Sequence, residues 1–483
     1  MKKWIKRGGY CVLVLLCTLM LGITVQAKTD ATIKKGIYAD GIELSGLTTE
    51  EATQVIEDYV EQLKSIEITL LGAQEREIIV TAEDFGLSWG NPRLVEEAIT
   101  LGTQGNVIQR YKALKDLEHE KYIYPIELQF DVEAINNILA QECVKYDKQA
   151  VNYSLKRTKG TFSVVEGQTG YLLDVEASID NIYDYMMEQW NREPDRIPLN
   201  IIVEQPKGSE EELSVVTDVL GTFTTSYSNS GVARSANVEN GCRLINGVTL
   251  YPGEEFSTIQ LVTPFTAKNG YYMAASYING KVVDSLGGGI CQVSTTLYNA
   301  VLLAELQVKE RYNHSMVVSY VDRSADAAIA ESSGKDFRFV NSTDYPIYIE
   351  GICENKQVII NIYGKETRSA GRSVRYESEI LEEILPPADE ITADAGKPLG
   401  YISTESAHIG YKARLWKIVT ENGVEVSREV VNNSKYKMSP QSAVVGVATD
   451  DPHKYEEIMA AIGTFNIAHV KNVIALLTAP PAE

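Results

Sequence analysis

Positive charge is scarce in this sequence. Its 483 residues include 45 Lys and Arg against 66 Asp and Glu, which gives a formal net charge of −21. No basic stripe offsets the repulsion by phosphate, so the composition argues against a nucleic-acid partner. The chain is nevertheless expected to fold, because 44% of its residues are hydrophobic and only 23% are charged. This length is sufficient for about three domains.

Motifs for metals and nucleotides are absent as well. The sequence has no His-Glu-x-x-His run, and one cysteine with one histidine does not make a three- or four-ligand metal site. The alternating strand-like and helix-like segments between residues 37 and 203 contain no nucleotide-binding fingerprint. We therefore expect no metal and no other cofactor.

Cysteine is also rare. Four of the six cysteines follow the N-terminal segment, namely Cys143, Cys242, Cys291 and Cys353. They are too few for a disulfide-stapled scaffold, although an even number outside the cell permits disulfides. Two alternatives stay open. A Cys242–Cys353 bridge would leave Cys291 free, whereas a bridge that consumed Cys291 would exclude its use as a nucleophile.

The N-terminal segment has the pattern of an export signal. Four basic residues precede an uncharged run from Tyr10 to Val25, and Ala27 ends a small-residue site of the kind that signal peptidase cleaves. A run of 16 residues is short for a membrane-spanning helix, which needs about 20. We therefore favour a cleaved signal peptide at residues 1–27 over an uncleaved signal anchor, and expect membrane contact only through this segment.

A glycine-rich loop joined to an apolar helix spans residues 287–304. Apolar residues recur there at helical spacing, at Val293, Leu297, Ala300, Val301 and Ala304. Gly287, Gly288 and Gly289 let the backbone approach a ligand closely, so we predict that they bind one. Cys291 falls in or just before the first helical turn, where the macrodipole favours a thiolate. The same pattern also fits a buried cysteine after a tight turn.

His314 is a candidate base for Cys291, since it is the only histidine between residues 120 and 407. A strand-borne imidazole that meets a helix-borne thiol is the arrangement of Cys/His acyl-transfer enzymes. Asp326 or Asp336 could orient the imidazole ring, and only one of them can fill that position.

Three polar residues after Cys291 are further candidates. Gln292 could donate a hydrogen bond to an oxyanion, as could the backbone N–H groups at the helix start. Ser294 and Thr295 could contact a ligand, although residues of this type more often cap the first turn of a helix.

These motifs resemble the VanW family, a group of extracytoplasmic proteins found mainly in Gram-positive bacteria and named from a vancomycin-resistance cluster. The resemblance covers roughly residues 222–365 and implies a location at the cell surface rather than a particular reaction. One departure is Ser324, where such proteins usually have glycine. The matching stretches are residues 234–237, Gly247, 251–257, Gly270-Tyr271, 287–300, His314-Ser315, Asp326-Ala327, Asp336-Phe337 and 341–343.

The rest of the chain suggests a multidomain α+β protein. Residues 28–206 read as a duplicated α+β region that resembles a domain named for peptidoglycan binding, and 207–213 as a polar linker. The VanW-like domain follows at 214–368, with its Cys-bearing helix against antiparallel strands. A β-rich domain at 369–449 resembles the five-glycine (G5) domain of cell-surface proteins, and 450–483 reads as a helical tail.

Three functions fit these features. The chain could bind the wall, with a Cys/His site contacting wall peptide; it could be an acyl-transfer enzyme (amidase, peptidase or transpeptidase) on peptidoglycan peptides; or it could be a structural envelope protein. We favour binding of peptidoglycan or another cell-wall polymer, because an exported thiolate is exposed to oxidation. The expected location is the extracytoplasmic cell surface, either secreted or anchored by the N-terminal segment.

Overall fold

The computed structural model describes residues 31–278 and 281–479. The chain forms two compact units: Met1–Ala150 with Thr169–Gln205, and Val151–Gln168 with Pro206–Glu483. The expected class, a multidomain α+β protein, is confirmed, since both units mix helices and strands. Within the described ranges, every helix is too short or too polar to cross a membrane. The predicted signal segment, residues 1–27, lies outside the described residues.

The first unit has one core that both of its predicted repeats share. Strand β11 of the second repeat pairs in parallel with β3 of the first, so the two repeats interlock. Its helices are α2 (Thr49–Lys64), α3 (Leu94–Thr100), α4 (Val107–His119), α5 (Val132–Ile138) and α6 (Val175–Glu188). Its strands are β1 (Ile37–Ala39), β2 (Ile42–Glu43), β3 (Glu67–Leu71), β4 (Glu77–Thr81), β5 (Ser88–Trp89), β6 (Tyr122–Tyr124), β7 (Leu128–Gln129), β10 (Gly170–Leu173), β11 (Asp195–Pro198) and β12 (Ile201–Glu204).

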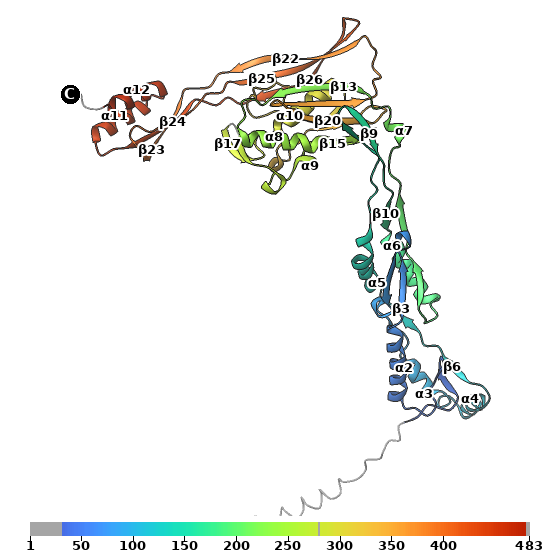
Figure 1. The fold of residues 1–483 in the computed structure, drawn as a ribbon. Helices are drawn as coiled ribbons and strands as arrows, with labels where there is room; N and C mark the ends of the chain where they lie inside the picture. The colour runs from blue at the N-terminus through green and yellow to red at the C-terminus, as the bar shows by residue number, and fades with distance from the viewer. Residues whose placement is uncertain (1–30, 279–280, 480–483) are drawn as a thin grey trace, which may run out of the picture. The chain divides into compact units, whose positions relative to one another are not determined.

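The second unit is larger and contains the Cys-bearing helix (Figure 1). Its helices are α7 (Glu210–Leu213), α8 (Val232–Ile245), α9 (Thr258–Val262), α10 (Cys291–Leu303), α11 (Pro452–Ile462) and α12 (Ile467–Leu477). Its strands are β8 (Ser154–Thr158), β9 (Thr161–Val165), β13 (Asp218–Ser226), β14 (Val248–Leu250), β15 (Glu255–Ser257), β16 (Met273–Ile278), β17 (Lys281–Leu286), β18 (Gln307–Glu310), β19 (Arg338–Val340), β20 (Ile347–Glu354), β21 (Gln357–Gly364), β22 (Arg372–Ile384), β23 (Glu390–Pro398), β24 (Ile402–Glu405), β25 (Gly410–Glu421), β26 (Val424–Tyr436) and β27 (Ser442–Ala448).

Helix α10 is the buried centre of the second unit. It packs with α8 on a four-stranded antiparallel sheet of order β13-β21-β20-β14, and every residue from Gln292 to Leu302 is buried. A Cβ atom on Gly221 of β13 would lie 2.3 Å from the carbonyl oxygen of Ala300. Only glycine therefore lets the strand approach the helix this closely.

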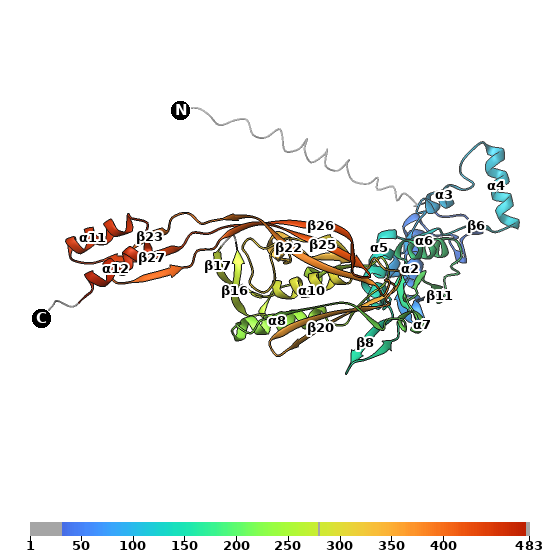
Figure 2. The same ribbon diagram turned by 90° about the horizontal axis from the view of Figure 1, so that it is seen from above.

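The β-rich segment packs directly on this central domain. Strands β22, β25 and β26 form an antiparallel sheet that lies beside α10 in both views (Figures 1 and 2). Leu415 and Val431 of this sheet belong to the same hydrophobic core as α10. The segments on either side of the expected boundary near residue 369 therefore share one hydrophobic core.

Two other predicted segments are also integrated into the fold. The predicted linker 207–213 contains the short helix α7, and its Leu213 is buried in a cluster with Leu155 of β8. The predicted tail supplies α11 and α12, whose apolar faces share a core with β27. Apolar side chains in each segment explain why it packs instead of remaining free.

Candidate active site

Cys291 begins α10; the residue is partly exposed and forms no disulfide. The loop before it is shaped by close packing. Gly287 and Gly289 have φ values of 80° and 103°, and a Cβ atom on Gly288 would lie 2.1 Å from the carbonyl oxygen of Ala274. Gly287 and Gly288 are buried, whereas Gly289 is partly exposed. Of the three glycines predicted to bind a ligand, only Gly289 therefore has appreciable exposed surface.

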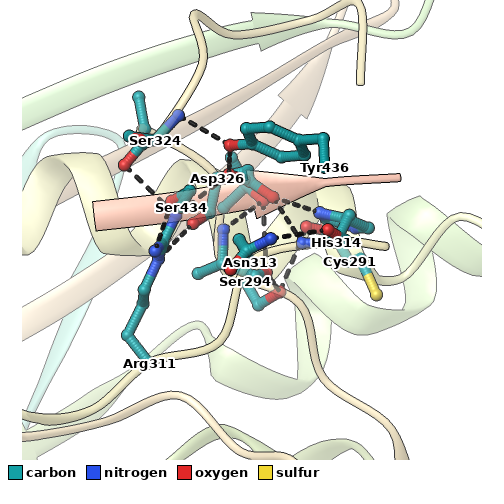
Figure 3. A network of polar contacts seen from close by, with 12 residues as sticks. Cys291, Ser294, Arg311, Asn313, His314, Ser324, Asp326, Ser434 and Tyr436 are labelled. Atoms are coloured by element: carbon teal, nitrogen blue, oxygen red, sulfur yellow. Dashed lines mark hydrogen bonds and ion pairs between the residues drawn. The ribbon is translucent and has the colours of Figure 1, made fainter. Parts of the chain in front are cut away.

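His314 and Asp326 form a buried pair next to Cys291 (Figure 3). The imidazole Nδ1 lies 2.6 Å from Oδ2 of Asp326, and the same oxygen accepts the backbone N–H of His314 at 2.7 Å. The His314 and Asp326 side chains are 8% and 1% exposed. Two contacts to one carboxylate oxygen fix the ring, so Nε2 is the nitrogen left for a reacting group.

The other oxygen of Asp326 is held by two residues from distant parts of the chain. The hydroxyl of Tyr436 donates to Oδ1 at 2.5 Å, and the guanidinium of Arg311 donates to it at 3.0 Å. Burial alone would raise the pKa of the Asp326 carboxyl, but its hydrogen bond to His314 and the charges of His314 and Arg311 hold that pKa below its usual value. Asp326 is therefore an anion inside the protein.

The environment of Cys291 favours a thiolate. Burial would raise the pKa of the thiol, but hydrogen bonding to His314 and the charge of His314 outweigh it and lower the pKa. Burial likewise opposes the charged form of His314, yet Asp326 and Cys291 together raise its pKa to about 9. A thiolate and an imidazolium stabilise each other in this way. When protonated, the thiol donates to the carbonyl oxygen of Ile329 at 3.4 Å.

Asp336 does not contact the imidazole. Its two oxygens accept the hydroxyl of Ser257 at 2.6 Å, the N–H of Ile259 at 3.0 Å and the N–H of Phe337 at 2.7 Å. These contacts hold the first turn of α9. Of the two aspartates considered from the sequence, the structure brings only Asp326 to His314.

The polar residues after Cys291 have structural contacts. The side-chain amide of Gln292 is buried and donates to Thr225 at 3.1 Å and to the carbonyl oxygen of Ser226 at 2.9 Å, so it is not directed at an oxyanion. Ser294 and Thr295 are fully buried and donate to the carbonyl oxygen of Ala327 at 2.7 and 3.2 Å. They neither cap the helix nor have surface for a ligand; they fix the segment that carries Asp326.

Three residues of the site were not predicted. Arg311 and Tyr320 flank His314 in the sequence, and Tyr436 lies on β26 of the β-rich sheet. Burial raises the pKa of Tyr320 well above its usual value, and the negative charge of Cys291 raises it further. Proximity to the only candidate histidine is a signal that could have indicated Arg311 and Tyr320. No local pattern marks Tyr436, which is 110 residues from its partner Asp326.

The remaining thiols bear on the two disulfide alternatives. All four described cysteines are free, and Cys242 of α8 lies next to Cys353 of β20. The hydrogen bond between the two raises the pKa of Cys242 and lowers that of Cys353. Cys291 is free as well, so its thiol is left for other chemistry. Among the described residues, no group of three or more His, Cys, Asp and Glu side chains is placed to hold a metal ion.

We expect Tyr436→Phe to lower the free energy of unfolding by about 1–3 kcal/mol, because it leaves buried polar groups without a partner. The lost hydroxyl accepts the N–H of Ser324 at 2.6 Å and donates to Asp326. Urea unfolding at constant m-value measures the change. Tyr411→Phe is the matched control in the same buried cluster, where the hydroxyl has no hydrogen bond within the described chain. Equal losses in the two variants would contradict a specific role for the Tyr436 hydroxyl.

The α+β domain that carries this cysteine, histidine and aspartate matches a known family. Residues 233–363 match the family model described as VanW like protein. Residues 78–193 match a model named for peptidoglycan binding, and residues 376–450 match the G5 domain. The central domain is therefore VanW-like, flanked by two further domain types.

Two proteins with similar sequences support the match to this family. The chain is 31% identical over 263 residues to "Uncharacterized protein YoaR" of Bacillus subtilis, covering 54% of this chain and 84% of YoaR. It is 26% identical over 140 residues to "Vancomycin B-type resistance protein VanW" of Enterococcus faecalis, covering 28% of this chain and half of that protein. The chain thus belongs to the VanW-like family, together with YoaR.

Two solved structures match the β-rich end. An IgA1 protease G5 domain is 25% identical and covers 16% of this chain and 94% of that domain, with a TM-score of 0.13. The G5 domain of HP0197 is 22% identical and covers 16% of this chain and 95% of that domain, with a TM-score of 0.10.

Proposed function

We propose that this protein is a cysteine-dependent acyl-transfer enzyme that acts on peptides of the cell wall. The matches to the VanW, peptidoglycan-binding and G5 models support a cell-wall-associated protein. One observation carries the catalytic proposal: a partly exposed cysteine at a helix start next to an imidazole that a buried carboxylate holds. A protein that only binds the wall does not need a cysteine beside a held imidazole. We therefore give this geometry more weight than the risk that an exported thiolate is oxidised, which favours binding from the sequence alone.

The proposed reaction begins with attack of the Cys291 thiolate on an amide carbonyl carbon. The new C–S bond gives a tetrahedral intermediate, whose oxyanion the backbone N–H of Cys291 stabilises. The next two N–H groups, of Gln292 and Val293, already donate to the carbonyl oxygens of Gly289 and Ile290. The His314 imidazolium donates its Nε2 proton to the departing nitrogen, so the C–N bond breaks and a thioester remains. Asp326 holds the ring throughout by its contact with Nδ1.

The thioester is then resolved by a second nucleophile. Water would complete a hydrolysis, and the amino group of another peptide would complete a transpeptidation. In both cases neutral His314 accepts the proton of the nucleophile, and the Cys291 thiolate leaves. The substrate class rests on the domain models, one of which is named for peptidoglycan binding.

Incubation with purified peptidoglycan tests the proposal. Wild-type protein under reducing conditions is expected to release or cross-link peptides, and mass spectrometry is expected to find an acyl adduct on Cys291. Cys291→Ala is expected to lose both signals completely while it still co-sediments with the polymer. Cys242→Ala is the control for loss of a thiol away from the site, and is expected to keep turnover.

The second candidate is a wall-binding protein without chemistry, which the matches to the peptidoglycan-binding and G5 models favour. The same experiment separates the two. Co-sedimentation without turnover by reduced wild-type protein, and without an adduct on Cys291, would leave binding as the function and would refute the enzyme.

A further inference from the structure

Arg234 lies beside the proposed nucleophile but outside the His–Asp pair. It belongs to the first turn of α8, and its side chain crosses the glycine loop: a Cβ atom on Gly289 would lie 2.7 Å from Cγ and 3.2 Å from Nε of Arg234. Its Nη2 donates to Oε1 of Gln292 at 3.0 Å. The guanidinium therefore rests against residues on both sides of Cys291.

The position of the guanidinium is fixed by neutral groups. Its Nη1 donates to the hydroxyl of Ser230 at 2.5 Å, and the partner of Nη2 is itself held, because the amide nitrogen of Gln292 donates to Thr225 and to the carbonyl oxygen of Ser226. Gln292 thus presents its oxygen, not its nitrogen, to Arg234. A side chain held this way loses little further conformational entropy when it binds a ligand.

The positive charge of Arg234 is not compensated. No carboxylate of the described residues lies within ion-pair distance of it, and the first turn of α8 contains no acidic residue. Arg311, by contrast, is paired with Asp326 at 3.0 Å. Arg234 is also only half-buried, so part of its surface is open to a ligand. In a chain with a net charge of −21, a fixed and unpaired cation is well placed to attract an anion.

The contacts of Arg234 with Gly289 and Gln292 place its charge beside Cys291, and the pKa of Tyr320 agrees with this position. Burial raises the pKa of Tyr320, the charge of Cys291 raises it further, and the charge of Arg234 opposes that rise. The pKa of the Tyr320 phenol is therefore affected by both the thiolate and the guanidinium. An anion bound by Arg234 would accordingly lie close to the Cys291 sulfur.

We propose that Arg234 is a specificity-determining residue that binds a free carboxylate of the peptide whose amide carbonyl meets Cys291. The inference rests on the proposed function and narrows its substrate class to peptides with an ionised carboxylate near the scissile amide. A guanidinium suits this role because it can donate two parallel hydrogen bonds to a carboxylate. Peptides in which that carboxylate is converted to an amide bind weakly.

Binding measurements that do not need turnover test the inference. The probes are a synthetic peptidoglycan stem tetrapeptide and its counterpart with every carboxylate amidated, titrated calorimetrically into full-length protein with Cys291→Ala. Adding Arg234→Gln is expected to raise the Kd for the carboxylate peptide about tenfold or more, and to leave the amidated peptide unchanged. Arg234→Lys is expected to give an intermediate Kd for the carboxylate peptide, because lysine keeps the positive charge but cannot donate two parallel hydrogen bonds.

Arg243→Gln is the matched control on the same helix, since its guanidinium donates to the exposed side chain of Asn240. It is expected to change neither Kd. Equal Kd values for the carboxylate peptide with and without Arg234 would overturn the inference, as would equal losses for both peptides. These outcomes are independent of whether wild-type protein turns over peptidoglycan, so failure here and failure of the proposed function are distinguishable.

Discussion

Asp326→Asn is expected to lower kcat for the proposed acyl transfer by about 10⁴-fold, as the same change does in a serine-protease triad. The substitution keeps the size of the side chain, and its amide oxygen can still accept from Tyr436 and Arg311. It removes the charge that, together with Cys291, raises the pKa of His314 to about 9, so the imidazolium is less favoured. Release of peptide from purified peptidoglycan under single-turnover conditions measures the effect.

Asp336→Asn is the matched control for this variant. Asp336 is also a buried aspartate, 8% exposed, but it holds the first turn of α9 and does not contact His314. Its replacement is expected to lower stability by about 1–3 kcal/mol and to leave kcat close to that of the wild type. If Asp336→Asn reduced kcat as strongly as Asp326→Asn did, the assignment of Asp326 as the orienting residue would be refuted.

Asp326 and Asp336 show which part of the site can be predicted from the sequence and which part cannot. A glycine loop before an apolar helix and a single histidine were sufficient to propose Cys291 and His314, because each is locally distinctive. Asp326 and Asp336 both follow the histidine in similar surroundings, so spacing cannot separate them. Only the folded structure distinguishes them, because Asp326 contacts Nδ1 of His314 whereas Asp336 contacts the first turn of α9.

Long-range partners explain the other residues that the sequence did not reveal. Tyr436 reaches Asp326 because β26 packs on the central domain, and β-strand patterns do not specify which other domain a strand will contact. Ser294 and Thr295 have the composition of helix caps, yet the segment around Ala327 takes their hydroxyls because it lies against the buried side of α10. Tertiary packing outweighs the local preference in both cases.

The β-rich sheet consequently has a second role besides any contact with the wall. Ser434 accepts from Arg311 at 2.9 Å, and Asn432 donates to the hydroxyl of Tyr298 on α10 at 2.8 Å. Together with Tyr436, these residues enclose Asp326 from the side of β26. The central domain therefore depends on its neighbour for hydrogen bonds that position Asp326 and its partner Arg311.

His314→Gln is expected to slow alkylation of Cys291 at pH 7 by about 30- to 100-fold, because an ordinary thiol is then only a few per cent thiolate. In wild-type protein the pKa of Cys291 is lowered by the hydrogen bond to His314 and by its charge, so the alkylation rate is expected to level off at a lower pH than for an ordinary thiol. Without the imidazole, burial raises the pKa of the thiol, so the rate should rise steeply with pH instead.

Peptide mapping after a pulse of iodoacetamide measures each thiol separately over pH 5–10. Cys143 is the internal reference, because burial raises the pKa of its thiol to about 11. Stability gives the second readout: the raised pKa of His314 means that its stabilisation is fully present below the unfolded-state pKa of 6.5 and is lost as the pH rises through about 9. The difference in unfolding free energy between wild type and His314→Gln should shrink over that window. Superimposable alkylation profiles for the two proteins would show that Cys291 and His314 do not share a proton, and the proposed chemistry would then lose its base.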